Sequence, residues 1–474
     1  MSYSERKFDL VIIGGGAAAF SAAIKAESYG VKTAMIEKHV LGGTCVNLGC
    51  IPSKNLLGAG ELLHSSRHPS YSAISACSTD LDFTQVIQDK DNLVRILRSN
   101  KYEHILSTFE NVQFIEGEAT FVSNKVVKVN GRRIESDKFI IATGSSPIIP
   151  AINGIDTVDY LTNVQALSLK QKPSSMVVIG GRALGLEFAQ MYSRFGTKVT
   201  LLQRSGRIIP THEPEISEKL KHYLRDEGIE IFTCVDITDV NQENGTKFVK
   251  STSSKNGEER IHKGEQLLIA TGRRPNTADL HLENAGVKLR ENNDAILVNS
   301  EMHTSMENIW AAGDVVGEPM LESVAAKEGS IAADNSLTDN RKSIDFLSVP
   351  SAIFTSPQVA SVGLTEIQMI EEFGFCSCKT LEMNQVPKAL TVNQTKGLIK
   401  MVVNPEQNNT IVGVHILADL AADIIHEAVL AVKHRFTIDD IIDTVHVFPT
   451  MTEAIKLVAT SFKQDLKKLT CCAE

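Results

Sequence analysis

The feature that most constrains the fold is a pattern that occurs twice: a short apolar run, a glycine-rich turn and a helix of small residues. The first copy starts with the apolar run 8–13, passes through Gly14-Gly15-Gly16 and predicts a helix over 18–29. A second apolar run over 32–36 follows and ends at Glu37. A strand, tight turn, helix and strand in this order predict a dinucleotide-binding α/β unit.

Each special residue of this first unit has a physical role in such a site. Gly14 permits the sharp turn, Gly16 lets the backbone approach a pyrophosphate, and Ala19 permits close packing of helix and strand. The helix N-terminus faces the phosphates, and the Glu37 carboxylate can accept hydrogen bonds from ribose hydroxyls. A glycine triplet alone is weak evidence, but the full context makes the prediction specific.

The second copy lies near the middle of the chain. The apolar run 176–179 leads into Gly180-Gly181-Arg182-Ala183-Leu184-Gly185, a predicted helix over 186–195 and a second run over 198–202. Gly180 and Gly185 are its cofactor-binding candidates. Arg182 replaces the second glycine of the pattern, where it could add a phosphate contact or obstruct one.

The residue that follows the second copy predicts which nicotinamide cofactor binds. Gln203 stands where the first copy has its glutamate, with Arg204 and Arg207 close behind. Loss of the acid removes the acceptor for the ribose 2′-hydroxyl, and an arginine can hold a 2′-phosphate. This pattern favours NADPH over NADH, with solvated surface charge as the alternative for both arginines.

Two nucleotide units in one chain suit a flavin enzyme that a nicotinamide reduces. Further turns follow apolar runs at Thr143-Gly144, at Gly272 and at Asp314, whose carboxylate can accept hydrogen bonds from a ribityl chain. Ala119 completes the set of cofactor-binding candidates. At 474 residues the chain should hold more than one domain, since single cores stop growing near about 250–300 residues.

Composition excludes several classes of partner. The net charge of −9 argues against nucleic acid and anionic membranes, and no apolar run is long enough to span a bilayer. The start of the chain lacks the apolar stretch of a signal peptide. Eight cysteines are too few for a disulfide scaffold of this length, and a working thiol pair suits a reducing cytosol. We therefore expect a cytoplasmic α/β enzyme.

Two cysteine pairs carry the chemistry. Cys45 and Cys50 are separated by four residues, a spacing that can close a strained, reducible disulfide ring. Buried cysteines or a metal half-site are the alternatives. Cys471 and Cys472 lie next to each other near the end of the sequence, where two thiolates could grip a soft metal ion or simply sit in a frayed tail.

The segment around the first cysteine pair reads Gly43-Thr44-Cys45-Val46-Asn47-Leu48-Gly49-Cys50-Ile51-Pro52-Ser53-Lys54. Together with both glycine turns, it resembles the flavin-dependent pyridine nucleotide–disulfide oxidoreductases. The resemblance covers nearly the whole chain and implies FAD and NADPH as cofactors. It makes Cys50 the thiol that contacts the flavin and Cys45 the interchange thiol that meets the substrate. Gly43 and Thr44 join the cofactor-binding set. Lys54 is expected near the flavin ring, in an ion pair with Glu187.

The same resemblance implies the domain organisation. We expect an FAD-binding domain over 1–150 and 280–345, an NAD(P)H-binding domain over 151–279 and a dimerisation domain over 346–474. The fold class is then α/β, with two Rossmann-like domains and a C-terminal α+β domain. Family members are homodimers whose active site borrows the partner's C-terminal domain.

The last domain decides the substrate in this family. Disulfide-reducing members carry a His-Pro-Thr motif whose histidine is the general acid and base, but here the segment reads Phe448-Pro449-Thr450. Phenylalanine cannot transfer a proton, so thiol–disulfide exchange loses its catalyst. His446 stays open as a substitute, because in a strand its side chain would point the same way as that of Phe448.

The missing histidine and the paired cysteines of the tail resemble one subfamily, the mercuric reductases, as does the stretch 386–397. Phe448 and Ala183 depart from its pattern, since tyrosine is usual at the first position and occurs at the second. The resemblance implies reduction of Hg(II) to Hg(0). Cys471 and Cys472 of the partner subunit would take Hg(II) from small thiols and pass it to Cys45 and Cys50. We expect the catalytic core without an N-terminal metal-binding domain.

Two other functions remain open. An NADPH-dependent disulfide reductase of the thioredoxin, glutathione or lipoamide type would turn over a disulfide substrate. A thiol protein that only sequesters soft metals, or a flavoprotein component of a complex, would show neither activity.

The remaining cysteines carry no predicted function. Cys77, Cys234, Cys376 and Cys378 are expected in exposed segments, and the Cys376-Ser377-Cys378 pair is interpreted as incidental rather than as a metal clip. His212 is expected in a solvated loop and Trp310 in the core.

Overall fold

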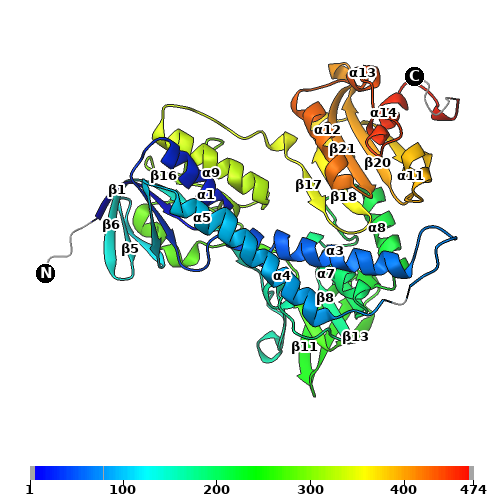
Figure 1. The fold of residues 1–474 in the computed structure, drawn as a ribbon, viewed down its shortest axis with the longest axis horizontal. Coiled ribbons are helices and arrows are strands. Elements are labelled where there is room, and N and C mark those ends of the chain that lie inside the picture. Colours follow the sequence, from blue (N-terminus) through cyan, green and yellow to red (C-terminus); the bar gives the residue numbers. More distant parts are fainter. Residues whose placement is uncertain (1–5, 78, 469–474) are drawn as a thin grey trace. The chain divides into compact units, whose positions relative to one another are not determined.

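The computed structural model describes residues 6–77 and 79–468 (Figure 1). They belong to two compact units. The first comprises residues 1–55, 87–149 and 272–344, and the second residues 56–86, 150–271 and 345–474. The predicted tail thiols Cys471 and Cys472 lie outside the described residues.

The first unit is built on a seven-stranded sheet. Its order is β3-β2-β1-β6-β5-β4, and β16 also pairs with β6. The first glycine turn follows β1, whose Leu10, Val11 and Ile12 are fully buried, as expected for a parallel strand covered on both faces. Its strands are β1 Arg6–Ile13, β2 Thr33–Glu37, β3 Val112–Glu116, β4 Ala119–Ser123, β5 Val126–Val129, β6 Arg132–Ile141 and β16 Ile309–Ala311. Two further strands, β7 Ser145–Pro147 and β15 Arg273–Pro275, form a separate antiparallel pair.

Small residues allow two helices of this unit to pack closely. The alanines of α1 (Ala17–Ser28) are buried, and α9 (Glu322–Leu337) lies against them. A Cβ added to Gly329 of α9 would lie 2.0 Å from the Ala18 carbonyl oxygen, so only glycine fits there. The other helices are α2 Gly43–Leu48, α5 His104–Ser107 and a π-helical turn Ser99–Glu103; α3 (Cys50–Arg67) and α4 (Phe83–Arg98) continue into the second unit.

The second unit contains the second glycine turn. A parallel sheet runs in the order β10-β9-β8-β14, beside a three-stranded antiparallel sheet β11-β12-β13. Its elements are α6 Asn163–Ala166, β8 Ser175–Ile179, α7 Ala183–Arg194, β9 Lys198–Gln203, α8 Pro214–Asp226, β10 Glu230–Thr233, β11 Val235–Glu243, β12 Thr246–Ser253, β13 Glu259–Gly264 and β14 Gln266–Ile269.

The C-terminal part of this unit is a five-stranded antiparallel sheet in the order β17-β18-β21-β20-β19. Helices α12 and α14 pack against it (Figure 1). The elements are β17 Ser351–Ile353, β18 Gln358–Gly363, α10 Glu366–Phe373, β19 Ser377–Glu382, α11 Pro387–Thr391, β20 Leu398–Asn404, β21 Thr410–Ala418, α12 Ala421–Lys433, α13 Ile438–Asp443 and α14 Glu453–Thr460.

The predicted α/β fold class is confirmed, with both strand–turn–helix–strand units and a C-terminal α+β part. Trp310 is buried, as expected. Cys234 is also buried, so its expected exposure was wrong: it lies at the start of the long hairpin β11–β12, whose apolar residues form a core. No helix among residues 6–77 and 79–468 is long and apolar enough to span a membrane.

Candidate functional site: a dithiol beside a dinucleotide cradle

The first glycine turn is a cradle made of backbone. Gly14 has φ +129°, and a Cβ there would lie 2.2 Å from the Ala142 carbonyl oxygen. Across the turn, a Cβ on Gly43 would lie 2.6 Å from the Gly16 Cα. Helix α1 starts directly after Gly16 without a side-chain cap. Bare amides at a helix N-terminus, approached closely by glycine backbone, fit a dinucleotide pyrophosphate.

Glu37 ends β2 above this turn, and Ala19 is fully buried in α1 as its packing role requires. The Glu37 Oε1 accepts a hydrogen bond from the His39 backbone amide at 2.7 Å, and a Cβ on Gly15 would lie 3.0 Å from the Glu37 Oε2. The carboxylate is thus held over the turn, where a ribose would lie.

Asp314 sits in a polar cluster of the same unit. Its Oδ2 accepts a hydrogen bond from the Ser145 hydroxyl at 2.5 Å and lies 3.9 Å from the Arg273 Nε, which itself donates to the Ser145 hydroxyl at 2.7 Å. Asp314 is therefore fixed in place and remains partly accessible, as a ribityl acceptor needs.

The remaining turn candidates of this unit shape the backbone. Thr143 donates from its hydroxyl to the Asn276 carbonyl at 2.8 Å, while Gly144 and Gly272 adopt φ +70° and +128°. Ala119 lies at the start of β4 with its side chain in the core, so only its backbone is available to a ligand.

The predicted redox pair lies on two consecutive helices. Cys45 is in α2 and Cys50 is the first residue of α3, and both are in the reduced thiol form. Gly49 makes the connection, since a Cβ there would lie 2.9 Å from the Thr44 carbonyl oxygen. A hydrogen bond between the two sulfurs, together with burial, holds the pKa of Cys45 far above its usual range. Cys50 is the more exposed residue of the two.

Two residues beside this pair were missed by the sequence analysis. Glu322, the first residue of α9, is hydrogen-bonded to Cys45, and burial raises the pKa of its carboxyl. The half-buried Tyr102 phenol interacts electrostatically with both thiols and with Glu322, and burial raises the pKa of Tyr102 to about 12. Neither residue belongs to a motif, and both are more than 50 positions away from Cys45 in the sequence.

The second glycine turn repeats the geometry of the first. A Cβ on Gly180 would lie 2.2 Å from the Ala270 carbonyl oxygen, and one on Gly185 would lie 1.9 Å from the Gly180 carbonyl oxygen. Gln203 ends β9 as Glu37 ends β2, but it is buried and accepts a hydrogen bond from the Gly181 amide at 2.8 Å. Gln203 thus holds the turn in shape.

The arginines next to this turn differ in exposure. Arg204 is exposed, while Arg207 is half-buried and donates to the Pro210 carbonyl at 3.3 Å. An exposed guanidinium beside a second dinucleotide cradle is available to a 2′-phosphate, so this cradle fits NADPH.

Lys54 and Glu187 belong to different units. Lys54 is half-buried in α3, and Glu187 is buried in α7, where its Oε1 accepts the Phe354 backbone amide at 2.9 Å. Their ion pair stays a prediction.

The segment that contains Phe448 is not a strand, so Phe448 and His446 do not share a strand face. Phe448 is 45% exposed, whereas the His446 side chain is only 9% exposed, with Nε2 2.7 Å from the Glu427 Oε1 and Nδ1 2.9 Å from the Thr444 carbonyl oxygen. Glu453 has a buried Oε2 without a hydrogen-bond partner among the described residues, and burial raises its pKa.

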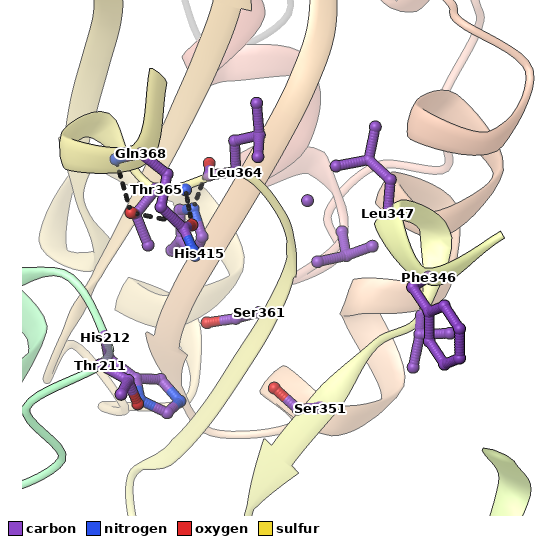
Figure 2. Close-up of a pocket in the computed structure, with 13 residues that line it drawn as sticks. Thr211, His212, Phe346, Leu347, Ser351, Ser361, Leu364, Thr365, Gln368 and His415 are labelled. Carbon is purple, nitrogen blue, oxygen red and sulfur yellow. Dashed lines mark hydrogen bonds between the residues drawn. The ribbon is translucent and has the colours of Figure 1, made fainter. Parts of the chain in front are cut away.

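A cavity of about 320 Å³ lies elsewhere in the second unit (Figure 2). Its lining includes His212, Ser361 and His415, and His415 donates from Nε2 to the Leu364 carbonyl at 2.9 Å. His212 lies in a loop, as the sequence predicted, but it is half-buried rather than solvated, and burial lowers its pKa to about 4. The cavity contains none of the predicted site residues.

Two dinucleotide cradles and the hydrogen-bonded Cys45–Cys50 dithiol define a nucleotide-dependent dithiol oxidoreductase. The family comparison agrees: residues 8–329 match the pyridine nucleotide-disulphide oxidoreductase model, and residues 349–459 match the dimerisation domain of the same family. This chain belongs to the pyridine nucleotide-disulphide oxidoreductase family. Its dimerisation domain indicates a homodimer.

Similar proteins cover the chain almost completely. It is 43% identical to a mercuric reductase of Staphylococcus aureus, over 98% of this chain and 84% of that relative. It is 39% identical to a mercuric reductase of Streptomyces lividans, over 98% of each chain. Among solved structures, the Cu(II) complex of the HOCl-induced flavoprotein disulfide reductase RclA from Escherichia coli superposes with a TM-score of 0.86, at 30% identity and over 97% of this chain and 100% of that one.

The cofactors follow from the family and fit the geometry. The chain is an oxidoreductase that uses FAD and NADPH. The glycine cradle of the first unit, Glu37 and Asp314 suit FAD, and the second cradle with Arg204 suits NADPH. The bound cofactors supply the electrons that the dithiol needs to cycle.

Proposed function

We propose that this chain reduces Hg(II) to Hg(0) at Cys45 and Cys50, with NADPH as the electron source. The observation that carries the proposal is the hydrogen-bonded dithiol beside a dinucleotide cradle, in a chain 35–43% identical to mercuric reductases. Thiolates are the ligands that soft metal ions prefer. Two sulfurs in contact can hold one such ion and present it for reduction.

The residues around the pair divide the work. Cys50, at the N-terminus of α3, is the thiolate on the flavin side, because a helix N-terminus favours negative charge. Cys45 is the interchange thiol that meets the incoming Hg(II)–thiol complex, and it stays protonated until the ion arrives. Its proton passes to the Glu322 carboxylate, to which the thiol is hydrogen-bonded. Lys54 lies near the flavin ring and is held there by the proposed ion pair with Glu187.

The proposed active site includes the partner subunit. Cys471 and Cys472 of the partner subunit take Hg(II) from small thiols and pass it to Cys45 and Cys50 by ligand exchange. An apolar surface supports such an interface: Val445 and Val447 are 87% and 77% exposed, next to the exposed Phe448. Phe448 replaces the proton-transferring histidine of disulfide reductases, which metal reduction does not need.

The first test is anaerobic NADPH oxidation with Hg(II) and an excess of small thiol, with volatile Hg(0) trapped and counted. We expect NADPH consumption that depends on Hg(II) and matches the Hg(0) released. Cys45→Ser/Cys50→Ser should abolish it, and Cys77→Ser, which changes an exposed cysteine outside this pair, should not. NADPH consumption without Hg(0) would exclude the proposal.

A complementation experiment tests the shared site. Cys45→Ser/Cys50→Ser subunits lack the inner pair, and Cys471→Ser/Cys472→Ser subunits lack the tail pair. Mixed dimers contain one intact site only if the tail serves the partner. Turnover of thiol-bound Hg(II) should therefore return when the two variants are co-expressed. If mixed dimers are no more active than either parent, the tail serves its own subunit or none.

The structural likeness to a disulfide reductase supports a second candidate. His446 is the proton-transfer group it would need, and Glu427 holds its ring at 2.7 Å. Turnover of glutathione disulfide or lipoamide that His446→Gln abolishes would favour this function. We expect no such turnover.

A further inference from the structure

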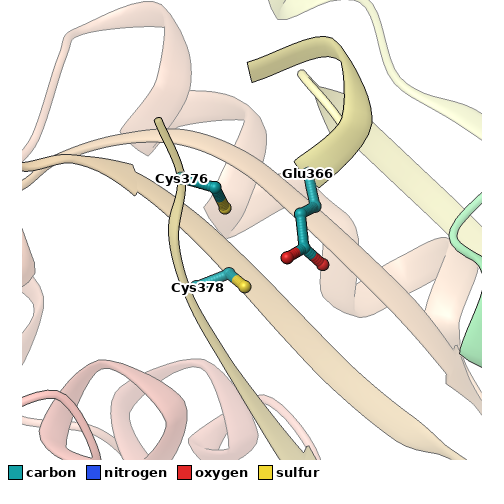
Figure 3. Close-up of side chains that lie close together, drawn as sticks. All are labelled: Glu366, Cys376 and Cys378. Atoms are coloured by element: carbon teal, nitrogen blue, oxygen red, sulfur yellow. The ribbon is translucent and has the colours of Figure 1, made fainter. Parts of the chain in front are cut away.

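The C-terminal antiparallel sheet brings together a second group of soft ligands. Cys376 and Cys378 flank Ser377 at the start of β19, so their side chains leave the same face of the strand. Glu366 is the first residue of α10, and Figure 3 shows its carboxylate pointing toward both sulfurs. The two sulfurs and a carboxylate oxygen all lie within 4.8 Å of one another.

We propose that Cys376, Cys378 and Glu366 form a binding site for one thiophilic metal ion, with Hg(II) as the ion that this enzyme would meet. The site binds the ion without reducing it, and so goes beyond the proposed reaction at Cys45 and Cys50.

The distances suit such an ion. A metal at about 2.3 Å from each of two sulfurs can bridge at most about 4.6 Å between them, and the Cys376 and Cys378 sulfurs lie within 4.8 Å of each other. The Glu366 carboxylate supplies a third, weaker ligand, since it already accepts a hydrogen bond from the Cys378 thiol. Both cysteines are half-buried, which keeps them accessible to a small metal complex.

The neighbouring charges favour a cation of this kind. Glu213, Glu215 and Glu366 also converge, but the Lys400 ammonium fills the space between them, at 2.9, 3.0 and 2.5 Å. This acidic cluster is therefore closed to hard cations. The three carboxylates outnumber the one ammonium, so negative charge remains beside the two thiols and attracts an incoming cation.

Ligand exchange balances the loading step. An ion arriving with two small thiolate ligands forms two bonds to Cys376 and Cys378 and breaks two bonds to its carriers. The protons of both cysteine thiols leave with the departing small thiols. No oxidant or reductant is needed.

The test uses the full-length, FAD-loaded protein in which Cys45, Cys50, Cys471 and Cys472 are replaced by serine. This parent is loaded with Hg(II) in excess glutathione, separated by gel filtration and analysed for mercury per subunit and for the sulfur–mercury absorption band. We expect a single retained ion. Adding Cys376→Ser/Cys378→Ser should remove it, either single substitution should remove it too, and the matched Cys77→Ser/Cys234→Ser pair should keep it.

An unchanged mercury content in the Cys376→Ser/Cys378→Ser protein, or none in the parent, would overturn the proposal. If that variant fails to fold, maleimide labelling of the parent decides: Hg(II) should protect Cys376 and Cys378 and leave Cys77 reactive, and equal labelling with and without metal would refute the site. The outcome is independent of the proposed reaction, because the parent lacks both catalytic pairs.

Discussion

Single residues control the protonation of the redox pair. The hydrogen bond between Cys45 and Cys50 and the charge of Glu322 both oppose ionisation of Cys45, so the two sulfurs do not carry charge together. The Glu322 carboxylate, which is hydrogen-bonded to the Cys45 thiol, is in place to accept its proton.

The first prediction concerns Glu322. Replacing it with glutamine removes a negative charge that raises the pKa of Cys45, so thiolate should form at lower pH. The pH profile of Cys45 alkylation in the reduced enzyme, resolved by mass spectrometry, should shift downward. Glu291→Gln, which changes an exposed carboxylate of the same unit, is the control. Identical profiles for wild type and Glu322→Gln would show that the carboxylate does not act on the thiol.

At the scale of elements, we expect the two strand–turn–helix units to bind different cofactors. Gly14 and Gly180 occupy equivalent positions in the two turns. At each position, an added Cβ would lie 2.2 Å from a backbone carbonyl oxygen. Any side chain there collides with the strand that forms the far wall of the cradle.

Alanine substitutions should therefore separate the cofactors. Left-handed backbone costs a non-glycine residue about 1–2 kcal/mol before the clash is counted, enough for roughly a tenfold loss of affinity. Gly14→Ala should yield protein depleted of flavin absorbance, while Gly180→Ala should keep its flavin and show a KM for NADPH raised about tenfold or more. Gly58→Ala, in an open helical position, should keep both. A yellow Gly14→Ala enzyme would contradict this assignment.

A buried ion cluster joins α8, α10 and β20. Lys400 is 1% exposed and contacts Glu213, which is fully buried. Removing one partner of a buried pair leaves an uncompensated charge and costs about 3–5 kcal/mol. Lys400→Met should lower the free energy of unfolding by that order in urea, followed by circular dichroism. Lys219→Met, which breaks an exposed pair with Glu382, should cost less than about 1 kcal/mol. Similar losses for the two variants would argue against the cluster.

At the scale of the whole molecule, the exposed apolar segment of the C-terminal sheet domain implies a covering partner. Val445→Glu/Val447→Glu places two charges on that surface, and we expect monomers in sedimentation equilibrium together with loss of Hg(II) turnover. The control Ile261→Glu, which places a charge at an exposed isoleucine on β13, should leave the dimer intact. A dimeric double variant would place the interface elsewhere.

Local patterns were enough to predict much of this protein. The glycine turns, the acid and the glutamine that end the second strands, and the cysteine pair are encoded within short segments, because turn geometry and helix starts depend on neighbouring residues. The sequence left open whether the segment around His446 is a strand; in the structure it is not one, and His446 contacts Glu427 of α12.

The sequence by itself determined two dinucleotide units, a dithiol and the family they resemble, since each is a motif of fixed spacing. Only the tertiary structure placed Glu322 against Cys45, paired His446 with Glu427 and turned Cys376, Cys378 and Glu366 toward one another. These contacts join residues from different elements, and their meeting depends on how strands and helices pack, which no local spacing records.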